Sequence, residues 1–129
     1  MAGSKGLRTV SYEADANLSA LQYHMVALQT DGQVKQATAT TSIAGILQDD
    51  PDTAGDGALV AIGGISKCVV DGNAAAIAAG DMLASDASGQ GVKTDTDKDQ
   101  YGAIAQEAST AAGDIIQVLV TPGQLVSAT

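Results

Sequence analysis

The feature that most constrains this fold is a tight turn, Ala-Gly-Asp, which is followed each time by a short apolar segment. The turn occurs three times, and the segments after it are residues 58–62, 82–84 and 115–120. Glycine adopts positive φ freely and aspartate hydrogen-bonds to nearby backbone, so the tripeptide is typical of a turn. Segment 115–120 is mostly aliphatic and β-branched, which suits a buried strand. Pro122 cannot donate to a β-ladder, so we expect it to end that strand.

A longer repeat underlies these turns. A shift of 58 residues, which places residue 33 on residue 91, gives nine identities in thirty positions of 33–62 and 91–120. The amino-acid composition alone would give several-fold fewer identities. Upstream, Met25 matches Met82 at a shift of 57. Solenoids usually need three or more repeats, so two copies indicate two related halves of one small structure.

The sequence therefore predicts an all-β domain. Ten short β-prone segments are separated by turn residues every eight to twelve positions, which is typical of a small β-barrel or sandwich of short strands. We expect an extended N-terminal arm, residues 1–13, and a single β-domain, residues 14–129, that contains the two related halves. Segment 74–80 remains ambiguous, because Asn73 and Gly80 could also cap one short helical turn.

Composition predicts a thin core and an acidic surface. Alanine supplies 24 of the 129 residues, Val, Ile, Leu and Met together supply 30, and there is no Trp or Phe. Small side chains bury little area each, so we expect burial to be completed in a homo-oligomer. The net charge of −9 argues against a nucleic-acid surface and an anionic membrane. No signal-like or membrane-spanning run is present, so synthesis and folding in a cytoplasm is the expectation.

No residue pattern supports catalysis or a cofactor. His24 is the sole histidine and lacks a neighbouring nucleophile motif, and Cys68, the sole cysteine, alternates within a strand pattern as a core thiol would. Asp95–Asp99 resembles the start of a calcium loop, but Gln100 and Gln106 stand where that loop needs Gly and Glu. We therefore expect no metal there, nor at the acidic segment 49–56, and we expect that the protein is not an enzyme.

Two segments are candidates for protein contacts. Lys5 and Arg8 are two of only six basic residues, and Leu7 and Val10 accompany them in a segment that alternates like an edge strand. This arm is either frayed or docks on an acidic neighbour, for example by adding to an exposed sheet edge. The small side chains Ala74, Ala75 and Ala76, with Ile77, allow close approach and are the candidate oligomer interface.

The repeated pattern resembles a known family, the capsid decoration or cement proteins of tailed phages. The resemblance lies in Ala79-Gly80-Asp81 followed by an apolar strand and Gly91-Val92, and in Ala103-Ile104-Ala105 followed by Ala112-Gly113-Asp114. It covers most of residues 22–121, with Ala103 where the family pattern has Gly. The matching motifs are turn chemistry and not a reactive site.

The resemblance implies a structural virion protein made in the host cytoplasm. It implies a compact β-domain that binds the major capsid protein on the outer surface of an assembled head and stabilises it, usually as a homotrimer and sometimes as a dimer. The family has no catalytic residues to carry over. The alternative is a non-enzymatic surface-binding module for carbohydrate or adhesion, although three tyrosines supply few aromatic platforms.

Overall fold

The computed structural model describes residues 6–39, 42–94 and 100–124, and these residues form β-strands, turns and loops without a helix. The strands are β1 (Arg8–Ala14), β2 (Met25–Leu28), β3 (Gln33–Gln36), β4 (Gly45–Leu47), β5 (Gly57–Asp71), β6 (Met82–Ser85), β7 (Gly91–Lys93), β8 (Gln100–Ala105) and β9 (Ala112–Gln124). The predicted all-β class is confirmed. Because the described residues contain no helix, none that could span a membrane occurs among them.

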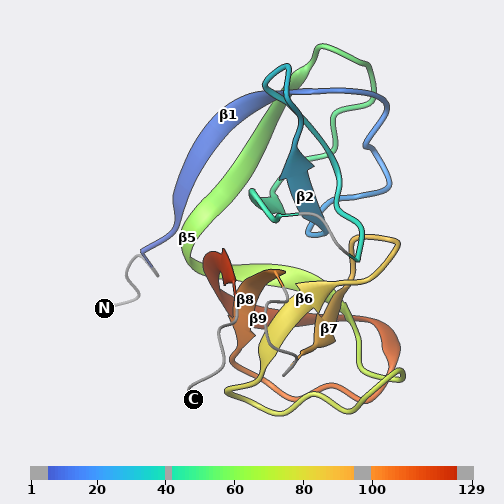
Figure 1. Cartoon of the computed structure of the whole chain (residues 1–129), viewed down its shortest axis with the longest axis vertical. Coiled ribbons are helices and arrows are strands. Elements are labelled where there is room, and N and C mark those ends of the chain that lie inside the picture. Colours follow the sequence, from blue (N-terminus) through green and yellow to red (C-terminus); the bar gives the residue numbers. More distant parts are fainter. Residues whose placement is uncertain (1–5, 40–41, 95–99, 125–129) are drawn as a thin grey trace.

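The strands form two rings that share β5. In the first ring the order β1-β3-β2-β4-β5 is closed by pairing of β1 with β5, and in the second the order β5-β7-β6-β8-β9 is closed by pairing of β5 with β9. In Figure 1 the two rings lie one above the other, and β5 passes from the upper to the lower. Each is an irregular ring of short strands and not a regular barrel.

The same pairing pattern recurs in both rings. Each has one long antiparallel pair, β1–β5 or β5–β9, and one short parallel pair, β1–β3 or β5–β7. Individual registers also correspond: Met25 lies opposite Ile46 in the first ring, and Met82 lies opposite Ile104 in the second. The repeating unit is therefore longer than 33–62 and 91–120, because β1 corresponds to the second part of β5, and the first part of β5 corresponds to β9.

β5 bends at Gly63 and Gly64, where the two halves join. Gly64 has φ +84°, and a Cβ on it would overlap the backbone of Gly6. The neighbouring Gly63 lies under the Arg8 guanidinium. Up to Gly63 the strand pairs with β1, and from Gly64 onward it pairs with β9. Figure 1 shows the bend where β5 enters the lower ring.

The apolar core consists of a small cluster within the first half and a larger cluster to which both halves contribute. The first half has a small core of its own, which includes Leu18, Val26, Leu47 and Val60. The opposite face of its sheet carries Met25, Ile46 and Ala61, which are fully buried and cluster with side chains of the second half. The first half thus packs one sheet face against the second half.

Backbone hydrogen bonds fix this packing. The Val69 N–H donates to the Tyr23 carbonyl at 2.9 Å, and the Met25 N–H donates to the Gly89 carbonyl at 2.8 Å. The Gln48 side chain adds a bond from Nε2 to Ser66 Oγ at 2.9 Å. The start of β2 therefore lies between β5 and β7, which pair with each other only at Val70 and Gly91.

Two expectations from the sequence need correction here. Residues 8–13 are not an arm separate from the body, because each of them pairs with β5. Residues 1–5 lie outside the described residues. Pro122 does not end β9, which continues to Gln124. It is tolerated because β8 and β9 shift register between Tyr101 and Ala103, so that Pro122 has no direct partner.

We predict that Gly64→Ala lowers the free energy of unfolding by roughly 2–4 kcal/mol, because both the positive φ and the contact with Gly6 oppose a side chain. Gly113→Ala is the matched control. Gly113 has φ +82° with no atom near its Cβ position, so only the backbone penalty of roughly 1–2 kcal/mol applies. Urea titrations of both variants measure the difference, and equal losses would contradict close packing at the junction.

Candidate interaction surfaces

The chemistry-bearing side chains do not gather into a reactive site. Across residues 6–39, 42–94 and 100–124, no three His, Cys, Asp or Glu side chains are grouped as metal ligands would be. His24 is half-buried, with its Nδ1 3.1 Å from the Gln22 carbonyl oxygen. Asp95–Asp99, the near-match to a calcium loop, lies outside the described residues.

Cys68 is a core residue. It is fully buried, and its Sγ lies 3.5 Å from the Val69 carbonyl oxygen. Burial raises the pKa of the Cys68 thiol to about 12, and a backbone hydrogen bond from Gly91 only partly opposes this. A nucleophilic cysteine needs the thiolate form, so this thiol is placed for packing.

The acidic segment 49–56 is held against the body. Asp49 Oδ1 accepts a hydrogen bond from the Leu59 N–H at 3.1 Å. The Pro51 carbonyl accepts one from the Leu18 N–H at 2.8 Å, and Pro51 itself is buried. The sequence suggested only a solubilising loop, because the partners of these groups are distant along the chain.

The residues expected to touch a capsid differ in accessibility. Leu7 is 41% exposed, and Arg8 is exposed with no ion-pair partner among the described residues. Val10 is half-buried and lies opposite Val60 in the β1–β5 pair. Lys5 lies outside the described residues. Leu7 and Arg8 are therefore accessible to solvent, whereas Val10 is turned partly into the fold.

The residues expected at an oligomer interface do not form one surface. Ala74, Ala75 and Ala76 are exposed in the turn after β5, and no helix forms there. Ile77 is only 2% exposed and packs in the core, where it bridges to Ser109. Its placement at an interface is wrong, because an apolar residue in that turn is needed to anchor the turn to the second half.

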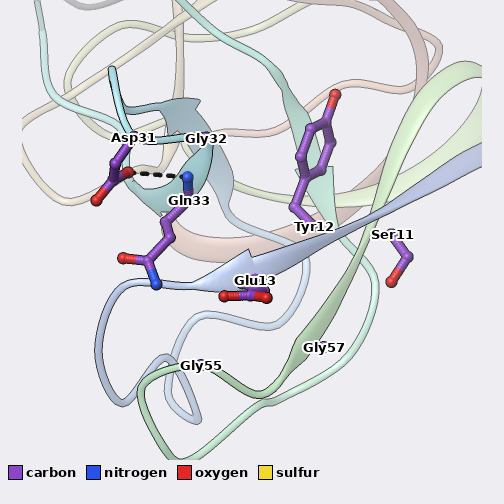
Figure 2. A pocket seen from close by; sticks show the side chains of 8 residues that line it. All are labelled: Ser11, Tyr12, Glu13, Asp31, Gly32, Gln33, Gly55 and Gly57. Carbon is purple, nitrogen blue, oxygen red and sulfur yellow. Dashed lines mark hydrogen bonds between the residues drawn. The ribbon is translucent and has the colours of Figure 1, made fainter.

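One hollow opens at the outer end of the first half. It has a volume of about 570 Å³ and is lined by Ser11, Tyr12, Glu13, Asp31, Gly32, Gln33, Gly55 and Gly57. Figure 2 shows Asp31 and Gln33 on one side and Tyr12 on the other. Asp31 Oδ1 accepts the Gln33 N–H at 2.9 Å, while no described residue bonds to the Glu13 carboxylate. The carboxylate oxygens of Asp31 and Glu13 can accept hydrogen bonds from hydroxyl or amino groups of a bound molecule. The residues that line the hollow include no nucleophile–base pair.

A second hollow lies at the junction of the two halves. It has a volume of about 240 Å³, and its lining includes Leu7, Tyr23, Ile65 and Lys67. Lys67 Nζ lies 5.6 Å from the centre of the Tyr23 ring, which is cation–π distance. Tyr23 has φ +65°, although a residue other than glycine is disfavoured there. The corresponding residue of the second half is Gly80, which takes positive φ without that cost.

An apolar row crosses the outer face of the second half. Ile65, Leu119, Ile104 and Met82 lie directly opposite one another on β5, β9, β8 and β6, and we call them the outer row. Leu119 is 36% exposed, and the other three are partly exposed. Sequence patterning could not find the outer row, because its members come from four separate strands.

The sequence matches no protein-family description and no curated protein. The fold is similar to a solved structure, the crystal structure of head fiber gp8.5 N base in bacteriophage phi29, with a TM-score of 0.67. The match covers 94% of this chain and 99% of that one, at 19% sequence identity. At this identity the likeness establishes the fold over nearly the whole chain.

We predict that buried Cys68 makes the protein less stable at high pH. Unfolding exposes a thiol that ionises from its ordinary value of 9.0, whereas the native thiol stays protonated to about pH 12. The unfolded state then binds fewer protons, so the free energy of unfolding falls above pH 9 by up to about 1.4 kcal/mol per pH unit.

Cys68→Ala supplies the reference, because it removes the thiol and leaves every other titratable side chain in place. Denaturant midpoints at several pH values give the two slopes. Wild type should have the steeper loss above pH 9, and parallel curves would mean that Cys68 ionises in the native state.

Proposed function

We propose that this protein is a structural component of a tailed-phage head that binds the outer surface of the assembled capsid and stabilises it. The observation that carries this proposal is the likeness of its fold, over 94% of the chain, to the base of a phage head fibre. The decoration-type repeat of Gly-Asp turns and short strands supports the same function independently.

The charge of the body supports a position outside the shell. With a net charge of −9, the protein is repelled by packaged DNA, whose phosphates require basic partners. The described residues likewise contain no metal-ligand group and no catalytic pair that would favour an enzyme. A binding role on an external protein surface requires neither.

The proposed partner is the major capsid protein, and the proposed assembly is a homotrimer made in the host cytoplasm and carried on the outside of the virion. A repeated scaffold gives a trimer several contacts at once, so modest individual affinities multiply. Binding to the folded form only also stabilises a domain whose core is built largely from Ala, Val and Ile.

We propose Lys5, Leu7 and Arg8 as attachment residues. Strand addition at β1 is not part of the proposal; β1 pairs with β5 along one edge and with β3 at Glu13 and Ala14 on the other. Leu7 and Arg8 remain exposed beside the junction, and Arg8 supplies a positive charge on an otherwise acidic protein. Attachment would then use the side chains of Leu7 and Arg8 together with residues 1–5, and the pairing of β1 with β5 would not change.

We predict that the purified protein co-sediments saturably with expanded heads that lack it and raises the temperature at which those heads break. Deleting residues 2–5 together with Arg8→Ala should weaken binding by about tenfold or more, since about 1.4 kcal/mol corresponds to each factor of ten. The deletion spares β1, so folding should be preserved.

Lys35→Ala is the matched control, because it removes a positive charge from β3 without touching the N-terminal segment. If the deletion variant binds heads as tightly as the wild type, the assignment of the attachment residues is wrong, but the proposed function is not contradicted. No binding of the full-length protein to expanded heads would contradict the function itself.

A further inference from the structure

We propose that the hollow at the outer end of the first half is a docking site for an extended, basic segment of a partner protein. This end hollow is the one lined by Ser11, Tyr12, Glu13 and the turn 31–33, together with two glycines. Its occupant is a stretch of protein backbone that carries a lysine or arginine side chain. The inference goes beyond the proposed function, and its test uses no phage heads, so the two can fail separately.

The internal repeat shows what occupies the equivalent place in the second half. β1 corresponds there to the second part of β5, so that Glu13 is equivalent to Val69, and Gly32 is equivalent to Gly89. The segment Tyr23–Met25 lies between these two counterparts. Its first carbonyl accepts the Val69 N–H at 2.9 Å, and its last N–H donates to the Gly89 carbonyl at 2.8 Å. In the second half this place therefore holds a segment of backbone.

The end hollow presents the equivalent glycine without a covering segment. A Cβ on Gly89 would lie 3.0 Å from the Met25 carbonyl oxygen and 3.5 Å from the Cβ of His24, because the inserted segment passes over it. A Cβ on Gly32 would meet no atom of the described residues within 4 Å. The space over Gly32 is therefore open where the space over its counterpart is filled.

A partner segment binds here through the same backbone groups. β5 and β7 pair at one position, whereas β1 and β3 pair at Glu13–Gln33 as well as at Ala14–Val34. Entry of a segment therefore exchanges the Glu13–Gln33 pair for hydrogen bonds from the Glu13 N–H and to the Gly32 carbonyl, as in other cases of strand addition. Because backbone bonds replace backbone bonds, the side chains of the occupant decide the affinity.

Charge favours a basic occupant. The lining of the end hollow includes the carboxylates of Glu13 and Asp31 but no Lys or Arg (Figure 2). Within the chain, the inserted residue that lies over Gly89 is His24. The equivalent residue of a partner lies over Gly32, which follows Asp31 directly in the sequence. A lysine or arginine at that position brings its charge next to the carboxylates, and such complementarity fixes the register of the bound segment.

A second copy of this chain does not match the end hollow. The second-half residue equivalent to His24 is Asp81, because each donates its N–H to the carbonyl three residues earlier in the same turn. Asp81 of another copy would meet the carboxylates of Glu13 and Asp31, between two chains of net charge −9. Lys93 lies 3.9 Å from Asp81, and this partly exposed ion pair offsets that repulsion only in part.

The test uses a capped synthetic peptide with the sequence of residues 19–27, which contains the segment that fills the equivalent place, carrying His24→Lys. In ¹⁵N-labelled protein it should shift the amide resonances of Glu13 and Gly32 saturably. The same peptide with His24→Asp should bind about tenfold or more weakly at low salt. Added salt should reduce this difference, because it screens exposed charges.

Glu13→Gln with Asp31→Asn should abolish the preference for the lysine peptide. Both changes keep an acceptor oxygen, so the hydrogen bond from the Gln33 N–H to residue 31 is retained. Asp86→Asn with Glu107→Gln is the matched control. These two side chains also accept backbone N–H groups, they lie in the second half, and their replacement changes the net charge equally.

Three results would overturn the proposal. The first is the absence of a saturable shift at the end hollow, and the second is equal binding of the lysine and aspartate peptides. The third is a preference that survives in the Glu13→Gln, Asp31→Asn protein or is lost equally in the control. Shifts of the same amides with protein concentration alone would identify a second copy as the occupant and would also overturn it.

Discussion

The continuity of β5 through Gly63 and Gly64 is the constraint on which the rest of the structure depends. The last strand of the first half runs directly into the first strand of the second, so the halves cannot be separated without breaking one strand. Gly64 takes a backbone conformation that disfavours other residues, and the Gly6 backbone approaches where its Cβ would be. The bend directs Met25, Ile46 and Ala61 onto the second half, and their burial contributes to the larger core.

Much of this fold could be predicted from the sequence because its determinants are local. The turns at Gly32, Gly55, Gly89 and Gly113 all have positive φ, as the turn chemistry requires, and the strands lie between them. The repeat in the sequence also has a physical basis: equivalent turns leave equivalent strands in equivalent registers. Local signals in the sequence were thus sufficient to predict most strands and the all-β fold class.

Long-range pairing could not be predicted in the same way. The alternation of residues 8–13 is equally compatible with a free edge and with the β1–β5 pair, and nothing nearby in sequence distinguishes them. Ile77 illustrates the same limit for the site, since its alanine-rich surroundings suggested a surface while its partner Ser109 lies thirty-two residues away. Leu7 and Arg8 are exposed as a binding segment requires, but the hollows and the outer row come from distant segments.

The two halves differ where they meet. The N–H groups of Tyr23 and Gly80 donate to the equivalent carbonyls of Leu47 and Ala105, so the two residues occupy the same position in the repeat. Glycine takes positive φ there without strain, whereas tyrosine costs roughly 1–2 kcal/mol. Only the first-half position also accepts a hydrogen bond from the other half, through Val69, and holds a ring against Lys67. The strain therefore lies where the first half inserts into the second, and the second half, which inserts into nothing within the chain, has an unstrained glycine at the equivalent position.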